Sequence, residues 1–252
     1  MNIESLDKSP LAAPEKLELK PPETVLSWGK TLIVAPHPDD ESLGCGGAIA
    51  LLREFDAEVF VLVLSDGTLS HPNSKKFPPG KLRDLREDEI KKALKVLGVS
   101  PNCIEFFRYK DRCVPNENSE NWQEAAERCL EYLAEIKPET ILVPWRRDPH
   151  PDHRAAFQLF NYAKQKNLTA IKILEYPIWL WEIAETDDAP RAVEVAAWRL
   201  DIKKVQDKKQ RAIGKHKSQI TDLIDDDAEG FRLSPEVLEN FMIDWEVYLE
   251  TI

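Results

Sequence analysis

Short apolar runs alternate with amphipathic segments between residues 31 and 175, and this alternation limits the folds open to the chain more than any other feature. Each run is aliphatic or β-branched, and the strands are predicted at residues 31–36, 58–64, 104–107, 140–145 and 171–175. The helices between them are predicted at residues 44–54, 81–97, 121–136 and 153–165. Strands without polar alternation are buried on both faces, which is typical of parallel sheets. The sequence therefore predicts an α/β fold, with a Rossmann-like, doubly wound, mostly parallel sheet and helices on both faces.

The two ends of the chain depart from this pattern. Residues 1–29 are polar and contain several prolines, and we interpret them as an extended arm before a single domain at residues 30–252. A chain of 252 residues suits one such domain. Later in the chain we expect one more strand and two charged helices, at residues 193–200, 203–224 and 235–248.

Composition argues against several classes of partner and location. Acidic residues outnumber basic ones, 45 to 34, and Lys and Arg form no block, so we expect no nucleic-acid partner. No apolar run has membrane-spanning length, and the first residues lack the pattern of a signal peptide. The four cysteines form no Cys-x-x-Cys pair, which favours free thiols and a cytoplasmic location.

Histidines and carboxylates gather directly after two of the predicted strands. Residues 37–41 are His-Pro-Asp-Asp-Glu, and residues 148–153 are Asp-Pro-His-Pro-Asp-His. The carboxyl ends of parallel strands lie at one edge of a sheet, where open α/β sheets bind ligands. One His-Pro-Asp segment alone is usually a polar turn that caps a helix. Two of them, with three of the chain's five histidines, predict one metal site.

The ion expected at this site is zinc, with iron or another divalent metal as alternatives, because imidazole nitrogen and carboxylate oxygen suit these ions. We expect His37, Asp40 and His153 to bind it and to leave one position open to water, whose pKa zinc lowers to about 7. Asp39 is then expected to act as the general base. In the second run, Asp152 is expected to hold an imidazole in position, and His150 is expected to stabilise an oxyanion. Spacing alone leaves open which carboxylate binds and which is the base.

The glycine run Gly44-Cys45-Gly46-Gly47 allows another interpretation, a dinucleotide-binding loop. The run lacks Gly-x-Gly-x-x-Gly spacing, and two carboxylates precede it where a pyrophosphate would approach. Since like charges repel there, the metal site is the preferred interpretation.

Together these motifs resemble the PIG-L / LmbE-like deacetylases. The resemblance covers about residues 30–220 and rests on residues 37–47, on residues 150–153 and on a late segment from Lys209 to Gln219. It implies a zinc enzyme that removes N-acetyl groups from N-acetylglucosamine-type sugars. The roles that it implies are zinc binding for His37, Asp40 and His153, general base for Asp39, and stabilisation of the tetrahedral intermediate for His150.

Four residues are candidates for contacts to the substrate: Asp66, Arg86, Arg146 and Arg147. The first two match positions of the family, but Arg86 has the alternative role of a solvated helix residue that pairs with Glu87 or Glu89. The other two arginines would either bind an anionic group of the substrate or pair with nearby acids, and both roles stay open. The aromatic-rich stretch at residues 175–182 can stack on a sugar face or cover an interface, although burial in the core is the commoner fate of such rings.

The sequence thus predicts a zinc-dependent N-deacetylase that acts on a small N-acetylated sugar or glycoconjugate. Two alternatives stay open. A non-haem iron oxygenase also uses two histidines and one carboxylate, although its usual fold is a β-barrel. A sugar-binding module with decayed catalytic machinery would bind the sugar and release no acetate.

Overall fold

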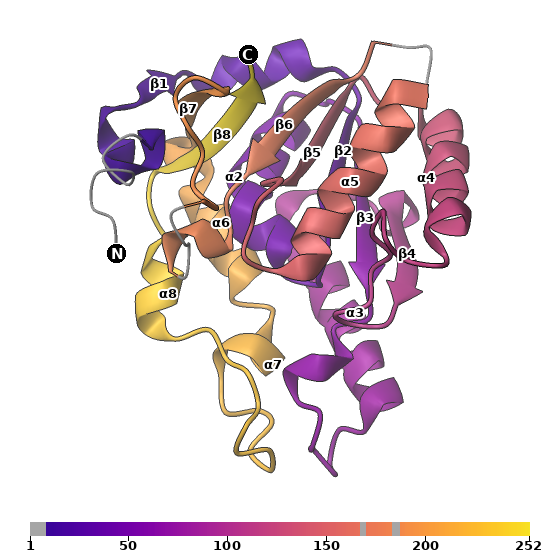
Figure 1. Ribbon diagram of the computed structural model, residues 1–252. Coiled ribbons are helices and arrows are strands. Elements are labelled where there is room, and N and C mark those ends of the chain that lie inside the picture. The colour runs from indigo at the N-terminus through magenta and orange to yellow at the C-terminus, as the bar shows by residue number, and fades with distance from the viewer. Residues whose placement is uncertain (1–8, 167–169, 183–186) are drawn as a thin grey trace.

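The computed structural model describes residues 9–166, 170–182 and 187–252, which form one mixed sheet with helices on both faces (Figure 1). The order across the sheet is β1-β7-β8-β6-β5-β2-β3-β4. The strands are β1 (Glu18–Lys20), β2 (Thr31–Ala35), β3 (Val59–Ser65), β4 (Ile104–Tyr109), β5 (Thr140–Pro144), β6 (Lys172–Tyr176), β7 (Val195–Asp201) and β8 (Trp245–Thr251). The helices are α2 (Asp40–Glu54), α3 (Pro79–Leu97), α4 (Trp122–Ile136), α5 (Pro151–Lys166), α6 (Gln206–Ile213), α7 (Lys217–Ile220) and α8 (Pro235–Glu239).

The sheet is parallel except at β8, which is antiparallel to its neighbours β6 and β7. At its centre, Ile33 of β2 pairs with Val61 of β3 on one side and with Leu142 of β5 on the other. The predicted α/β class with a mostly parallel, doubly wound sheet is therefore confirmed.

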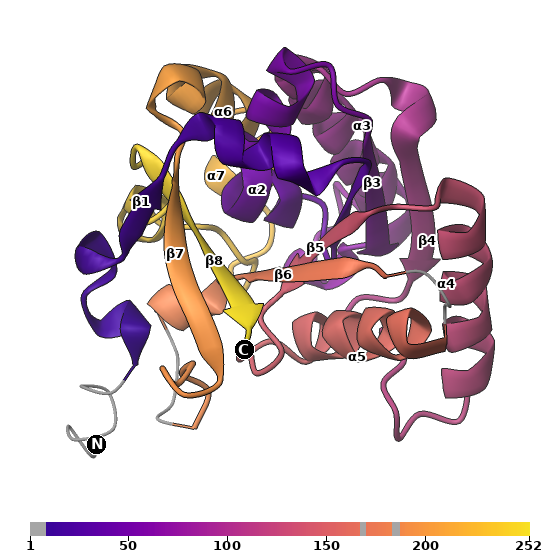
Figure 2. The ribbon, with the colours of Figure 1, turned by 90° about the horizontal axis from the view of Figure 1, so that it is seen from above.

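Successive residues of β2 face two different cores. Ile33 packs into the core that α2, α3 and α6 cover, whereas Leu32 and Val34 pack into the core that α4 and α5 cover. Figure 2 shows these two helix layers on opposite sides of the sheet. All five residues of β2 are buried, which explains why the strand has no polar alternation.

The glycine run of the sequence lies inside α2 and does not form a nucleotide-binding loop. A β-carbon at Gly46 would lie 2.9 Å from Cγ of Lys209, and one at Gly47 would lie 2.5 Å from Cγ2 of Ile202. The absence of side chains thus allows the segment after β7 to pack closely against α2.

The helix predicted at residues 235–248 is wrong, because α8 ends at Glu239 and residues 245–251 form β8. In this strand Val247 and Leu249 face one apolar cluster, whereas Tyr248 faces another. Glu246 is also buried, and a charged residue inside the strand obscured its period of two.

The helix predicted at residues 203–224 is shorter and interrupted. Helix α6 ends at Ile213, directly before Gly214, and α7 is a single turn. Glycine is a poor helix former, and the chain turns here so that His216 enters the protein interior. The strand expected at residues 193–200 is present as β7.

Residues 18–28 belong to the sheet and its apolar core. Strand β1 pairs in parallel with β7, and a 3-10 helix follows at Pro22–Trp28. The buried Trp28 contacts Trp198 and Tyr248, with ring centroids 6.3 and 5.4 Å away. The domain boundary at residue 29 stays a prediction. In the part of the chain that the structure describes, no helix is both long and apolar enough to cross a membrane.

Candidate functional site

The two His-Asp runs meet at the point where the sheet changes direction of winding. Strands β2 and β5 are neighbours, but β3 and β6, which continue from them, lie on opposite sides. Residues 37–40 follow β2, and residues 148–153 follow β5. Doubly wound sheets bind ligands in the crevice that forms at such a switch point.

Three donor atoms of His37, Asp40 and His153 form a nearly equilateral triangle. His37 Nδ1 lies 3.3 Å from Asp40 Oδ2 and 3.3 Å from His153 Nε2, and the latter two atoms are 3.2 Å apart. Tetrahedral zinc with bonds of about 2.0–2.1 Å requires ligand atoms about 3.3–3.4 Å apart. The donor set and its spacing therefore fit a zinc ion. His150 adds a further nitrogen within 4.8 Å of both other histidines.

The outer nitrogens of the two imidazoles face carboxylates. His37 Nε2 lies 3.2 Å from Asp152 Oδ2 and 3.3 Å from Asp111 Oδ1. His153 Nδ1 lies 3.2 Å from Asp148 Oδ1. Histidines that bind metals commonly have such a carboxylate on the other nitrogen, because it fixes the tautomer and the ring orientation.

Mutual attraction keeps this cluster ionised despite its burial. Burial alone would raise the pKa of Asp40, but His153 and His37 hold it well below its usual range. Burial alone would lower the pKa of His153, but Asp40 and Asp148 raise it to about 9. The protonated imidazoles thus neutralise part of the charge of the surrounding carboxylates. A divalent ion bound here would take over this role.

Asp39 lies beside the triangle in an unusual backbone conformation. Its φ of 148° is uncommon for a residue with a β-carbon, and such conformations often occur at functional sites. Its N–H donates to Glu41 Oε2 at 3.0 Å, and its Oδ2 accepts from Arg86 Nη2 at 3.1 Å. Burial raises the pKa of Asp39 to about 6, although Arg86 opposes this shift. A carboxylate with this pKa can both take and release a proton near neutral pH.

His150 is a neutral hydrogen-bond donor in this arrangement. Its Nδ1 accepts from the N–H of Asp152 at 3.2 Å, which leaves the ring proton on Nε2. Burial, together with His37 and His153, lowers the pKa of His150 to about 3. An uncharged imidazole with a free N–H can donate to an oxygen that becomes negative.

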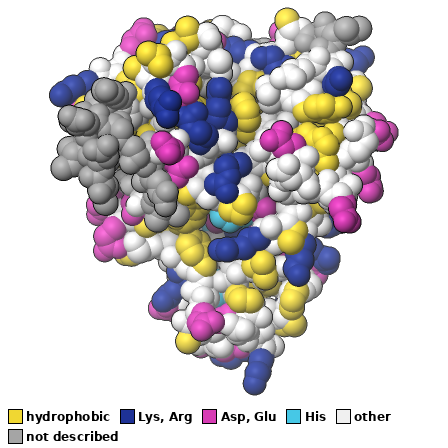
Figure 3. Space-filling model, viewed as in Figure 1, with side chains coloured by type: hydrophobic (Ala, Val, Ile, Leu, Met, Phe, Trp, Pro, Cys, Tyr) yellow, Lys and Arg dark blue, Asp and Glu magenta, His cyan; other side chains and the backbone are white. Residues whose placement is uncertain are grey.

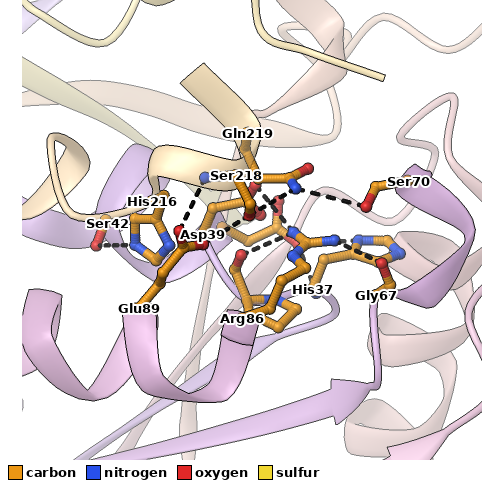
Figure 4. Close-up of polar contacts among 12 residues, drawn as sticks. His37, Asp39, Ser42, Gly67, Ser70, Arg86, Glu89, His216, Ser218 and Gln219 are labelled. Atoms are coloured by element: carbon orange, nitrogen blue, oxygen red, sulfur yellow. Dashed lines mark hydrogen bonds and ion pairs between the residues drawn. The ribbon is translucent and has the colours of Figure 1, made fainter. Parts of the chain in front are cut away.

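Arg86 of α3 is buried behind Asp39 (Figure 4). It donates to the carbonyl oxygens of Gly67 at 2.9 Å and Pro38 at 2.8 Å, in addition to Asp39. The alternative of a solvated residue paired with a neighbouring glutamate is therefore wrong. The two neighbours have other partners, since Glu87 binds Arg108 and Glu89 binds Ser218.

A second group of polar residues, for which no role was predicted, supports the site from the segment that leads into α7. His216 Nε2 lies 3.2 Å from Glu41 Oε1 and 3.2 Å from Ser42 Oγ. Because Glu41 also accepts from the N–H of Asp39, His216 is linked to the backbone of Asp39 through one carboxylate. Figure 4 shows Ser42 and His216 together, close to Asp39 and Arg86.

A cavity of about 370 Å³ lies next to the triangle of His37, Asp40 and His153. Its polar end includes His37, Asp39 and His150, and its apolar wall is formed by Leu43, Leu69, Ile178, Trp179, Phe231 and Leu233. Trp179, from the aromatic stretch of the sequence, contacts Phe231 edge to face with ring centroids 5.7 Å apart. Figure 3 shows part of a histidine side chain at the surface of this face, between hydrophobic and basic side chains.

The structure places the other three candidates for substrate contacts away from the lining of this cavity. Arg146 pairs with Glu175 and Arg147 pairs with Glu194, so they take the second of their two expected roles. Asp66 accepts from Thr68 N at 3.0 Å and from Asp111 N at 3.1 Å, and it thereby orders two loops near the site.

Asp148 and Asp111 are partners of the imidazoles that the strand-end motifs did not predict. Asp148 begins the second His-Asp run, and its position next to a strand end could have indicated that it contacts an imidazole. Asp111 follows β4, which extends to Tyr109, two residues beyond the predicted end of that strand. It therefore lies at a strand end as well.

Comparison with known proteins gives one family. The sequence matches the profile of PIG-L, described as GlcNAc-PI de-N-acetylase, over residues 32–164, slightly more than half of the chain. Diacetylchitobiose deacetylase of Thermococcus kodakarensis is 26% identical and covers 98% of this chain and 85% of its own length. A probable N-acetyl-alpha-D-glucosaminyl L-malate deacetylase 2 of Bacillus subtilis is 27% identical, over 75% of this chain and 82% of its own.

Two further proteins complete the comparison. The 4-oxalmesaconate hydratase of Pseudomonas putida is 29% identical over 72% of this chain and 70% of its own length. The solved structure of N,N'-diacetylchitobiose deacetylase from Pyrococcus horikoshii has a TM-score of 0.61 and 19% identity, and it covers 95% of this chain and 82% of that chain. This structural likeness shows the fold.

Proposed function

The chain belongs to the PIG-L family, and from this premise we propose that it is a zinc-dependent hydrolase that removes the N-acetyl group from an N-acetylglucosamine-type sugar or glycoconjugate. The observation that carries the proposal is the triangle of His37 Nδ1, Asp40 Oδ2 and His153 Nε2, with the carboxylate of Asp39 beside it. Two relatives named as deacetylases of N-acetylated sugars support the substrate class.

The proposed metal ligands are His37, Asp40 and His153, with iron or another divalent ion as the alternative to zinc. A zinc ion would supply Lewis-acid polarisation of the acetyl carbonyl and a water molecule with a pKa of about 7. Asp152 and Asp148 would keep each imidazole turned so that its lone pair faces the ion.

The proposed general base is Asp39. It takes a proton from the attacking water as the water oxygen bonds to the acetyl carbon. With a pKa of about 6 it can hold this proton and then deliver it to the amine nitrogen as the C–N bond breaks. His150 donates its Nε2 proton in a hydrogen bond to the developing oxyanion, and Arg86 keeps the Asp39 carboxylate in position. The products are acetate and a free amino sugar.

The test is an amine-release screen over N-acetylated sugars, glycolipids and nucleotide sugars. Metal-free protein and protein reconstituted with zinc or iron are compared in parallel. We expect amine and acetate in equal amounts from at least one compound, and only with metal bound. Fully metal-loaded, folded protein that releases neither from any compound would contradict the proposal.

A hydratase is the second candidate, because one relative is named 4-oxalmesaconate hydratase. Addition of water to a conjugated acid removes its ultraviolet absorbance and releases no amine, so the two activities are separable in one assay. The iron oxygenase would consume oxygen, and the decayed module would bind the sugar without releasing acetate.

We further propose a cytoplasmic location, since the four cysteines are free thiols. A single catalytic domain at residues 30–252, preceded by the N-terminal arm, remains the proposed domain organisation.

A further inference from the structure

Arg112 lies in the turn that follows β4 and lines the cavity beside the metal cluster. Its backbone N–H donates to Asp152 Oδ2 at 2.7 Å, and the same oxygen lies 3.2 Å from His37 Nε2. Two residues further along, the N–H of Val114 donates to Asp152 Oδ1 at 3.1 Å. The position of this turn is therefore fixed relative to the metal ligands.

The backbone of Arg112 is strained. Its φ is 61°, a left-handed value that glycine adopts without strain and that residues with a β-carbon rarely adopt. Strain of this kind persists where the surrounding contacts enforce it, and it is concentrated at functional sites. The backbone conformation alone would favour glycine here, so it does not explain an arginine.

Arg112 is an exposed residue, and among the described residues no carboxylate lies within ion-pair distance of its guanidinium. Three other arginines near the site differ in this respect. Arg86 binds Asp39, whereas Arg146 and Arg147 bind Glu175 and Glu194. Arg112 therefore presents an uncompensated positive charge at the opening of an otherwise acidic site.

We infer that Arg112 binds an anionic group, a carboxylate or a phosphate, on the part of the substrate that is attached to the N-acetylated sugar. A guanidinium presents parallel N–H donors that match the two oxygens of either group. This inference rests on the proposed function and narrows its substrate class. Diacetylchitobiose, which names one relative, is neutral, whereas the malate conjugate that names another is acidic; Arg112 favours the acidic class.

The test uses two matched pairs of N-acetylglucosamine glycosides with the metal-loaded full chain. Carboxymethyl is compared with carbamoylmethyl, and 2-phosphoethyl with 2-hydroxyethyl, so the pairs distinguish a carboxylate from a phosphate. We expect kcat/KM to be about 10- to 100-fold higher for the anionic member of at least one pair, the range of a charged hydrogen bond. The preference should decrease with ionic strength.

Variants at two positions separate the role of Arg112 from a general effect of charge. Arg112→Gln should reduce the ratio of kcat/KM between the anionic and the neutral glycoside of a pair to about one, because the charge is lost. Arg112→Lys should keep part of the ratio. Lys110→Gln removes the same charge from an exposed residue of the same turn that does not line the cavity, and it should keep the full ratio.

The outcomes distinguish the two proposals. Turnover of all four glycosides without any preference would overturn the role of Arg112 and leave the deacetylase proposal standing. Turnover of none would contradict the deacetylase proposal, and calorimetric binding of the same glycosides would then decide the role of Arg112. A binding preference for an anionic member that Arg112→Gln abolishes supports that role, and equal binding overturns it.

Discussion

Two buried ionic groups contact α2, one at the middle of the helix and one at its N-terminal end. They differ in how completely their charges and hydrogen-bonding groups are paired. Glu246 of β8 accepts from Gly47 N at 2.7 Å, Lys209 Nζ at 2.8 Å, Ala48 N at 2.9 Å and Tyr248 OH at 2.9 Å. One carboxylate thus faces one ammonium, and both are buried. At the strand ends, by contrast, five carboxylates surround two imidazoles and one arginine: Asp39, Asp40, Asp111, Asp148 and Asp152.

This difference separates a structural ion pair from a site prepared for chemistry. In the Lys209–Glu246 pair each carboxylate oxygen of Glu246 accepts from two donors, and the two charges cancel. The pair therefore needs no ligand to complete its hydrogen bonds or to balance its charge. The strand-end cluster has excess negative charge and opens onto a cavity. Since a buried charge without a partner is strongly unfavourable, the excess is best explained by a cation that the site is built to hold.

The largest effect is expected at Asp39. Asp39→Asn keeps the size of the side chain and removes its ability to take a proton. We expect kcat/KM for acetate release to fall by about 10²–10⁴-fold while metal content stays unchanged. Metal analysis and the release assay, run on the same preparation, check both points. Asp84→Asn, at an exposed residue of α3, serves as control, and full activity of Asp39→Asn would refute the assigned base.

A large effect on stability is expected at the structural pair. Lys209→Met leaves Glu246 buried without its ammonium, and we expect it to lower the free energy of unfolding by about 3–5 kcal/mol. The neighbouring Lys208→Met breaks only an exposed pair with Glu54 and should change it by about 1 kcal/mol or less. Denaturant unfolding measures both variants.

The double variant Lys209→Met/Glu246→Gln refines this comparison. It removes both charges and should recover part of the stability lost in Lys209→Met, because no buried charge is left unpaired. A double variant that is less stable than the single one would show that the hydrogen bonds from Gly47 and Ala48 matter more than the charge.

A moderate effect is expected at Asp148, the carboxylate behind His153. Asp148→Asn removes the charge that faces His153 Nδ1, and we expect metal affinity to decrease by about 10–100-fold. Competition with a chelator of known affinity measures the change. The same substitution at Asp84 should leave affinity unchanged, and an unaltered affinity in Asp148→Asn would show that this carboxylate does not support the metal.

The two regions also differ in how well the sequence predicts them. The proposed ligands His37, Asp40 and His153 follow parallel strands, and parallel strands bring their carboxyl ends to one edge whatever the details of packing. Glu246 lies on a strand that was predicted as a helix, and Lys209 lies on a helix whose boundaries were predicted wrongly. Their contact depends on tertiary packing. The partners of Arg146 and Arg147 could not be predicted for the same reason, since Glu175 and Glu194 are distant from these arginines in the sequence.

The smallest effect is a shift in pH dependence at Arg86. Asp39 acts as a base only when ionised, so kcat/KM should fall on the acidic side of the pH profile as Asp39 takes up a proton. The positive charge of Arg86 lowers the pKa of Asp39, and Arg86→Gln should therefore move the acidic limb of the profile to higher pH, whereas Arg86→Lys should move it less. A bound cation shifts the limb to lower pH in every variant, so the profiles must be compared at equal metal loading. An acidic limb that stays at the same pH in Arg86→Gln would mean that the limb reports a group other than Asp39.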